Sequence, residues 1–103
     1  MIFEQHHRVA RSHPSLPGHF PGNPVVPAVV ILDLVRQTVL RWRPDAVITS
    51  FPIGKFLVPL LPDTDFRVRL VEKSSGVLAF QCLSNDQILS KGTLTFSAPS
   101  EVE

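Results

Sequence analysis

Two residues with acid–base side chains, Asp33 and His19, have unusual surroundings in this 103-residue chain. Asp33 follows eight consecutive apolar residues at positions 25–32 and precedes two more. An isolated ionised carboxylate would be costly there, so we expect it to be paired, hydrogen-bonded or protonated. Burial raises the pKa of a carboxyl group, which would make Asp33 a plausible general acid. A structural aspartate that caps a nearby loop explains the pattern equally well.

His19 lies between Gly18 and the sequence Phe20-Pro21-Gly22. Neighbouring glycines and prolines hold a side chain in one direction and let a ligand approach the backbone. Imidazole titrates close to neutral pH, so a histidine fixed in this way is a good candidate for a general base. Taken alone, His19 is more simply interpreted as a surface histidine in a loop.

A helix is expected over residues 28–41, because Pro27 suits a first helical turn and Pro44 prevents further helix. Its first two turns are apolar all round, which is typical of a buried helix, and polar residues return only afterwards. The first N–H groups, of Ala28 and Val29, have no partner within the helix. They could stabilise a polarised carbonyl oxygen or a developing enolate, although capping by the preceding loop is the ordinary alternative.

The elements around this helix predict an α+β fold in a single domain spanning residues 1–103. Residues 12–27 contain five prolines and should form a stiff, ordered loop. Alternating or β-rich segments predict strands, the last four of them forming a meander. The expected strands are 2–11, 46–58, 66–71, 77–83 and 88–96, with turns at 61–64, 74–76 and 85–86. One curved antiparallel sheet would then wrap the buried helix.

Composition and charge exclude several classes of protein. Apolar residues make up 44% of the chain, charged residues 18%, and the net charge is +1 without a basic run. Neither a nucleic-acid-binding surface nor a polybasic membrane patch is therefore expected. The start lacks a secretion-signal pattern, and the longest apolar run falls short of the ~20 residues that span a bilayer. The simplest expected location is the cytoplasm.

The remaining side chains with possible chemistry are interpreted as structural. Cys82 is the one cysteine of the chain and falls in an expected strand, where it should be a small buried core residue. His6, His7 and His13 match no metal-ligand spacing, and a strand would point the first two to opposite faces. We interpret them as surface histidines and expect no metal site.

Residues 18–33 together with Gln37 resemble the active-site segment of the FabA/FabZ family of 3-hydroxyacyl-[acyl-carrier-protein] dehydratases. The family pattern is H-F-P-G-x-P, a hydrophobic residue, x-P-G, then a helix carrying Glu or Asp and a Gln four residues later. The spacing from histidine to acid equals the family's. The matching residues are Gly18, His19, Phe20, Pro21, Gly22, Pro24, Pro27, Asp33 and Gln37. A weaker match is Lys55-Phe56 with Pro59 and Pro62, and the short length is most similar to the small dehydratase-like proteins of aryl-polyene-type pigment clusters.

The resemblance implies the hotdog fold and a homodimer in which His19 of one subunit meets Asp33 of the other. The implied substrate is a 3-hydroxyacyl thioester on the phosphopantetheine of an acyl carrier protein or CoA, without metal or redox cofactor. His19 would remove the α-proton, and Asp33 would protonate the leaving β-hydroxyl. The N–H groups of Ala28 and Val29 would hold the thioester carbonyl.

Two departures from the family pattern leave alternatives open. Ala28 replaces a glycine, so its methyl group enters a place where the thioester comes close, and Asp63-Thr64 replaces the Gly-Asp of a turn. A hotdog thioesterase, a non-catalytic subunit of a heterodimeric dehydratase and a small-molecule-binding protein are the rival interpretations. An acyl tunnel could involve Leu32, Phe51, Phe56 or Phe80, for each of which an ordinary core role is expected.

Overall fold

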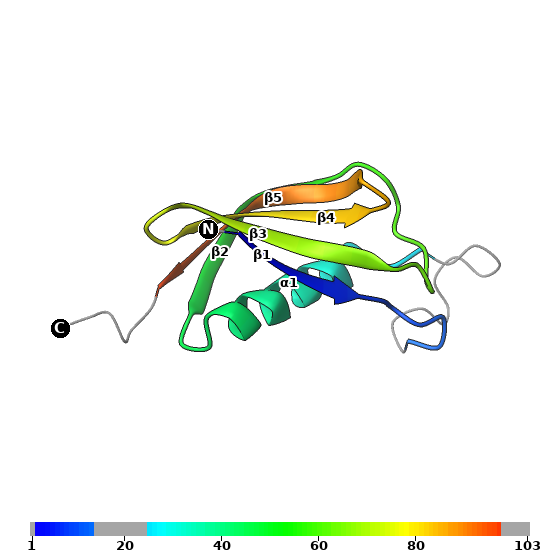
Figure 1. Ribbon diagram of the computed structural model, residues 1–103, viewed down its shortest axis with the longest axis horizontal. Coiled ribbons are helices and arrows are strands. Elements are labelled where there is room, and N and C mark those ends of the chain that lie inside the picture. The colour runs from blue at the N-terminus through cyan, green and yellow to red at the C-terminus, as the bar shows by residue number, and fades with distance from the viewer. Residues whose placement is uncertain (1, 14–24, 98–103) are drawn as a thin grey trace.

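Five strands form one antiparallel sheet, and a single helix lies across one face of it (Figure 1). The structure is a computed structural model that describes residues 2–13 and 25–97. The elements in chain order are β1 (Ile2–His7), α1 (Ala28–Trp42), β2 (Val47–Phe56), β3 (Phe66–Ser74), β4 (Val77–Ser84) and β5 (Gln87–Ser97). The predicted α+β fold, with a curved sheet around a helix, is confirmed.

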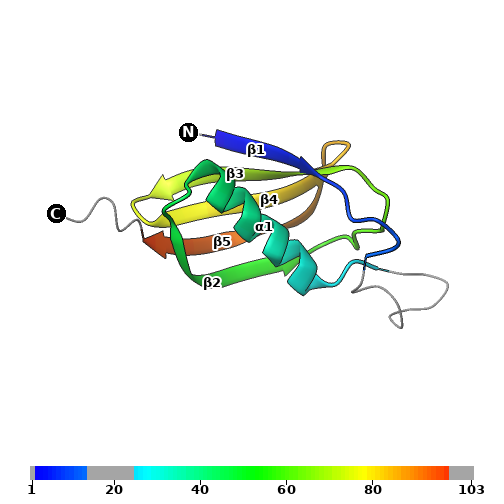
Figure 2. The same ribbon diagram turned by 90° about the horizontal axis from the view of Figure 1, so that it is seen from below.

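The strands lie in the order β1-β3-β4-β5-β2, and every neighbouring pair is antiparallel. Strands β3, β4 and β5 form the predicted meander. The prediction that β2 belongs to this meander is wrong, because the connection 57–65 carries the chain across the sheet and β2 pairs with β5 at the far edge. Seen from the helix side, β1 and β2 therefore form the two edges on either side of α1 (Figure 2).

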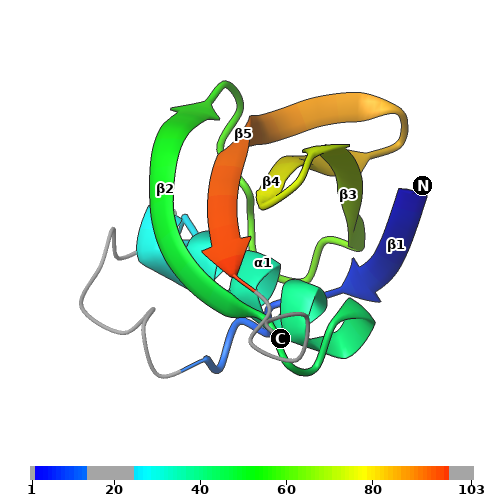
Figure 3. The ribbon, with the colours of Figure 1, turned by 90° about the vertical axis from the view of Figure 1, so that its left-hand side faces the viewer.

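Apolar residues alternate with more polar ones in the central strands, and the apolar residues define the face of the sheet that is covered by the helix. In β3, Phe66, Val68 and Leu70 are buried, whereas the arginines between them are only half-buried. Leu78, Phe80 and Cys82 repeat this pattern in β4, so Cys82 is a core residue as predicted. These side chains line the concave face, and the sheet curls around the helix (Figure 3).

The close contact between β5 and its neighbours depends on a glycine. A Cβ atom at Gly92 would lie 2.2 Å from the carbonyl oxygen of Ile53 and 2.7 Å from two ring carbons of Phe80. The Phe80 ring is held in place by an edge-on contact with Phe51, with a centroid distance of 6.1 Å. At Gly54, across the strand pair, a Cβ atom would meet only a ring carbon at 3.9 Å.

Helix α1 is amphipathic, although its sequence suggested that its N-terminal half is buried on all sides and that its C-terminal half is exposed. Ile31, Val35, Thr38 and Val39 are buried against the sheet. Val29, in contrast, is 73% exposed. The predicted division into a buried N-terminal half and an exposed C-terminal half is wrong for the single chain, because the sheet covers one side of the helix along both halves. Among residues 2–13 and 25–97, no helix is both long and apolar enough to cross a membrane.

The C-terminal end of α1 is tied to the sheet by aromatic and ionic contacts. Trp42 stacks on Phe3 of β1 with a centroid distance of 5.6 Å. Arg43 donates to the carboxylate of Glu72 in β3 and lies over the Trp42 ring. These contacts fix the direction of the helix, and with it the position of its N-terminal end.

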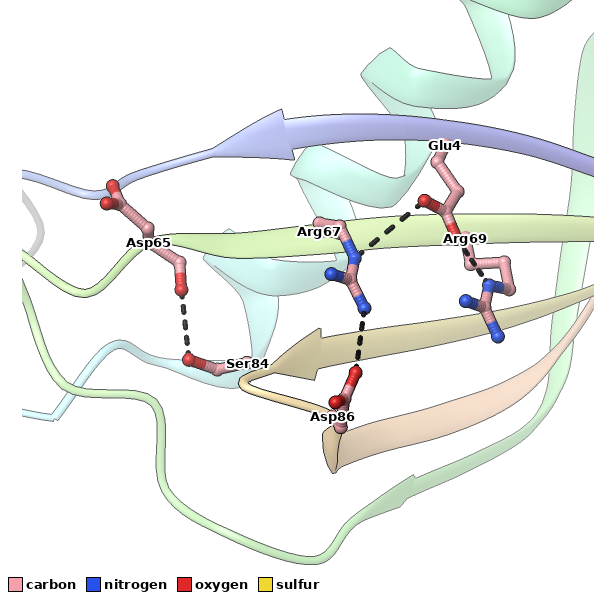
Figure 4. A network of polar contacts seen from close by, with 6 residues as sticks. All are labelled: Glu4, Asp65, Arg67, Arg69, Ser84 and Asp86. Carbon is pink, nitrogen blue, oxygen red and sulfur yellow. Dashed lines mark hydrogen bonds and ion pairs between the residues drawn. The ribbon is translucent and has the colours of Figure 1, made fainter.

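The outer face of the sheet carries a network of ion pairs between neighbouring strands (Figure 4). Glu4 of β1 accepts a hydrogen bond from Arg69 and lies 3.8 Å from Arg67, which also approaches Asp86. The Arg69 contact lowers the pKa of the Glu4 carboxyl group below its usual value. Ion pairs that are this open to solvent contribute little to stability individually.

Candidate active site

Asp33 lies on the outward face of α1, where its carboxylate accepts two hydrogen bonds. Arg36 Nε donates to Oδ1 at 2.9 Å, and Gln37 Nε2 donates to Oδ2 at 2.8 Å. Residues three and four positions later are neighbours on a helix surface, so the sequence itself places both donors. The structure thus brings together the acid and the glutamine that the resemblance paired.

The surroundings of Asp33 differ from the sequence-based expectation. Its side chain is 50% exposed, and the hydrogen bond from Arg36, followed by that from Gln37, lowers the pKa of the carboxyl group. The prediction of a buried carboxyl group with a raised pKa is wrong in the single chain. The apolar neighbours in the sequence are spread around the helix, and those that pack on the sheet point away from Asp33.

The N-terminal end of α1 has free donors among the described residues. Pro27 is the N-cap residue, and no side chain of residues 2–13 or 25–97 caps the helix. The first backbone bonds run from the amides of Val30 and Ile31 to the Pro27 carbonyl. Within the described part of the chain, the amides of Ala28 and Val29 therefore have no acceptor, as predicted for the first helical residues.

A pocket of about 310 Å³ opens beside this helix end. Its walls are apolar and come from the helix start and from the end of β2 with the loop that follows, including Val26, Ala28, Ile31, Phe56, Val58 and Leu60. A hydrogen bond of 2.8 Å from the Val26 amide to the Leu60 carbonyl joins the two walls. An apolar pocket next to free N–H donors suits an acyl chain with a polar carbonyl at one end.

Of the four residues considered for an acyl tunnel, Phe56 lines this pocket. Phe80 is 1% exposed and packs in the core, where Phe51 contacts it. Leu32 is partly buried against the core and does not line the pocket. The expected ordinary core role therefore fits these three, and Phe56 is the one with a place in the candidate site.

The catalytic histidine of the resemblance lies outside the described residues. The same is true of the neighbouring motif residues Gly18, Phe20, Pro21, Gly22 and Pro24. The pairing of His19 with Asp33 therefore stays a prediction. The loop 57–65 holds the described chain on both sides of this segment. The Asp63 amide donates to the Val9 carbonyl at 2.8 Å, and the Leu60 carbonyl accepts from Val26.

Asp63 itself adopts a left-handed conformation with a φ of 60°. This backbone region favours glycine, which is the residue that the family pattern has at the position of Asp63. The Asp63 side chain accepts a hydrogen bond of 3.2 Å from the Arg11 amide. The aspartate therefore adds a side-chain contact to the incoming end of the segment, which a glycine could not make.

The neighbouring histidines of β1 behave differently from each other. They point to opposite faces, as predicted, with His6 exposed. The interpretation of His7 as a surface histidine is wrong, because His7 Nε2 lies 2.8 Å from Thr38 Oγ1 beneath the helix. The Thr38 hydroxyl donates to the Leu34 carbonyl, so His7 must be the donor to Thr38. Burial lowers the pKa of His7.

Sequence reasoning missed two residues around the site. Arg36 was interpreted only as the return of polar residues along the helix, and the basic residue three positions after the acid was the available signal. The contact of His7 with Thr38 had no local signal, because it joins residues 31 positions apart. Among the residues that the structure describes, no group of three potential metal ligands occurs.

Comparison with known proteins places this geometry in a family. Residues 3–93 match the model of the ApeI-like family, described as ApeI dehydratase. The 3-hydroxyacyl-[acyl-carrier-protein] dehydratase FabZ of Bartonella bacilliformis is 34% identical over 87 residues, covering 74% of this chain and 56% of that protein. The chain thus spans little more than half the length of this relative.

Two solved structures have the same fold. An uncharacterized protein from Erwinia carotovora subsp. atroseptica has a TM-score of 0.80 and 25% identity, covering 97% of this chain and 86% of that one. The dehydratase heterocomplex ApeI:P from Xenorhabdus doucetiae has a TM-score of 0.81 and 23% identity, covering 92% and 86%. Since the family match runs from β1 into β5, this chain belongs to the ApeI-like family of FabZ-like hotdog dehydratases.

Proposed function

We propose that this chain dehydrates a 3-hydroxyacyl thioester to a trans-2-enoyl thioester. The observation that carries this proposal is the apolar pocket beside the uncapped start of α1, on the same helix as Asp33. The acyl group would be carried on the phosphopantetheine of an acyl carrier protein or of CoA. The pathway would be fatty-acid or polyene-type biosynthesis, in keeping with the family and the named relatives.

The position of Asp33 favours a site shared between two subunits. Residues two apart on a helix face roughly 200° apart, and Ile31 is 5% exposed and lines the pocket, whereas Asp33 points outward. Asp33 therefore faces away from the pocket of its own chain. A second subunit covering this side of α1 would bring its own pocket, and its own His19, to Asp33.

In the proposed reaction, His19 removes the α-proton of the bound thioester. The N–H groups of Ala28 and Val29 stabilise the negative charge on the carbonyl oxygen, and one such donor contributes about 2.7–4 kcal/mol to lowering the barrier. The bond from the β-carbon to its hydroxyl then breaks, and the hydroxyl leaves as water with a proton from Asp33. The two carbons are left joined by a double bond.

Ala28 is the proposed source of selectivity within this site. It lines the pocket and also supplies one of the free N–H groups. Its methyl group occupies space that the family's glycine leaves open. The thioester must therefore bind further from the helix start, or the substrate must have a narrower group at this point. This favours some acyl chains over others without removing the donor.

A thioesterase is the second candidate function, and the state of Asp33 favours it. A hydrolase of this fold would use the acid on the helix as a base that activates water. The pKa of Asp33 is lowered by Arg36 and Gln37, so the carboxylate is its stable form in the single chain. A base needs this form, whereas a general acid needs the protonated one.

One assay separates these functions. The purified chain is mixed with a 3-hydroxyacyl thioester on an acyl carrier protein or on CoA, and the products are identified by mass spectrometry. Loss of water with the thioester intact supports dehydration, and release of the free acid supports the thioesterase. Turnover only after addition of a related hotdog chain supports a heterodimer. Absence of dehydration under all of these conditions contradicts the proposed function.

A further inference from the structure

Each oxygen of the Asp33 carboxylate already accepts a side-chain hydrogen bond in the described structure. Oδ1 accepts from Arg36 at 2.9 Å and Oδ2 from Gln37 at 2.8 Å. The glutamine belongs to the family pattern, whereas the arginine has no place in it. Arg36 is thus a feature of this chain that the family mechanism does not explain.

The contact with Arg36 opposes the proposed role of Asp33 as an acid, because it favours the ionised carboxylate. A guanidinium group is a permanent cation with donors and no acceptor. A proton on Oδ1 would therefore lie beside a positive charge, and the hydrogen bond from Arg36 would be weakened. The amide of Gln37 can stay on Oδ2 in either state of the acid.

We propose that Arg36 is a positioning residue that holds Asp33 as a carboxylate in the resting site. When the substrate's β-hydroxyl displaces the guanidinium from Oδ1, Asp33 takes up a proton from solvent, and this proton leaves with the hydroxyl as water. The proposal rests on the dehydratase function proposed above. Both side chains are about half exposed, at 49% and 50%. Ion pairs this open to solvent are weak, so a bound substrate can displace the guanidinium.

The consequence is a dependence of turnover on pH that Arg36 sets. Among residues 2–13 and 25–97, Arg36 is the charged side chain in contact with Asp33, and Gln37 is its neutral partner. The predicted facing group from a second subunit is His19. Since Arg36 favours the ionised acid, it narrows the pH range in which Asp33 carries a proton. Removing the guanidinium should extend that range upward.

The test compares Arg36→Gln and Arg36→Lys with the unaltered chain. The pKa of the Asp33 carboxyl group is followed by NMR, and the pH profile of kcat/KM is measured with the thioester substrate. We expect Arg36→Gln to raise the pKa of Asp33 and to move the alkaline limb of the profile to higher pH. Arg36→Lys should return both towards the original values, because it restores the charge.

Arg41→Gln is the matched control. It removes the same charge from the last turn of the same helix, and Arg41 is exposed. We expect it to leave the pKa of Asp33 and the alkaline limb unchanged. A general loss of positive charge would shift both variants alike and would contradict a specific role for Arg36.

Three further outcomes would overturn the proposal. The pKa of Asp33 could stay the same in Arg36→Gln, the alkaline limb could stay while the pKa moves, or activity could fall equally at every pH. If the unaltered chain shows no dehydration, the proposed function fails independently. The NMR titration then still decides whether Arg36 holds the carboxylate, because it needs no turnover.

Discussion

Apolar residues lie on both faces of helix α1, but the two faces have different surroundings. Val35 packs against the sheet and is 0% exposed, whereas Val29 on the other side is 73% exposed. Asp33, Arg36 and Gln37 share that open side. The difference shows that an apolar helix sequence can serve two surfaces, one covered by its own sheet and one available to a second subunit or a substrate.

The largest expected effect comes from the chemistry of the open face. Asp33→Asn should lower turnover of the hydroxyacyl thioester by roughly 10²–10⁴-fold, the range for loss of a general acid. The fold should keep its thermal stability, because the side chain is half exposed. Asp45→Asn, at an exposed position after the helix, is the control and should retain full activity. A stable Asp33→Asn protein with normal turnover would remove Asp33 from the mechanism.

The next effect concerns the sheet that covers the buried face. Gly92→Ala places a methyl group against the Ile53 carbonyl and the Phe80 ring, and we expect a loss of about 3 kcal/mol in the free energy of unfolding. Gly54→Ala introduces the same group into open space and should change that free energy by less than about 0.5 kcal/mol. Urea unfolding measures both, and equal losses would show that the close approach at Gly92 is unimportant.

A pair of identical substitutions compares the two faces directly. Val35→Ala should cost about 2 kcal/mol of unfolding free energy, from two lost methyl groups and the space they leave. Val29→Ala should cost little in the isolated chain but weaken self-association, which sedimentation at a series of concentrations would detect. Weaker association from Val35→Ala and none from Val29→Ala would reverse the assignment of the faces.

The smallest effect is expected from the histidine beneath the helix. Burial lowers the pKa of His7 from an ordinary value of 6.5, so the unfolded chain binds a proton more readily than the folded one. The stability from neutral His7 is thus complete above pH 6.5 and is lost as the pH falls through the lowered value. Thermal unfolding across this pH range should show a loss of stability on acidification, and this loss should disappear in His7→Gln.

His6→Gln is the matched control for this pH effect. His6 is the preceding residue on the same strand and is exposed on the opposite face. We expect His6→Gln to keep most of the acid sensitivity of the original chain, because burial is the larger cause of the lowered pKa of His7 and the charge of His6 is the smaller one. If His6→Gln abolishes the loss of stability at low pH and His7→Gln retains it, the contact between His7 and Thr38 does not cause this loss.

Local patterns predicted most of the fold. The alternation of apolar and polar residues predicted β3, β4 and β5, and Pro27 predicted the start of the helix at Ala28. The place of β2 beside β5 could not be predicted in this way. It depends on pairing between residues about 40 positions apart, such as Ile53 with Thr93.

The candidate site was predicted in its components but not in its electrostatics. The motif identified Asp33 and Gln37, which the structure brings together. The predicted direction of the pKa shift of Asp33 was wrong, because a run of apolar residues in a sequence does not show which side chains of a helix point away from the sheet. Arg36 lies three residues from Asp33 and was within reach of sequence reasoning. The pairing with His19 stays a prediction, because His19 lies outside the described residues.

The most direct test of the account is complementation between two inactive variants. His19→Ala and Asp33→Asn are prepared separately, mixed in equal amounts and allowed to exchange subunits, with exchange followed by native mass spectrometry. If each site combines His19 of one subunit with Asp33 of the other, half of the random dimers carry one intact site, and about a quarter of the original dehydratase activity should return. Complete subunit exchange without any return of activity would contradict the shared site.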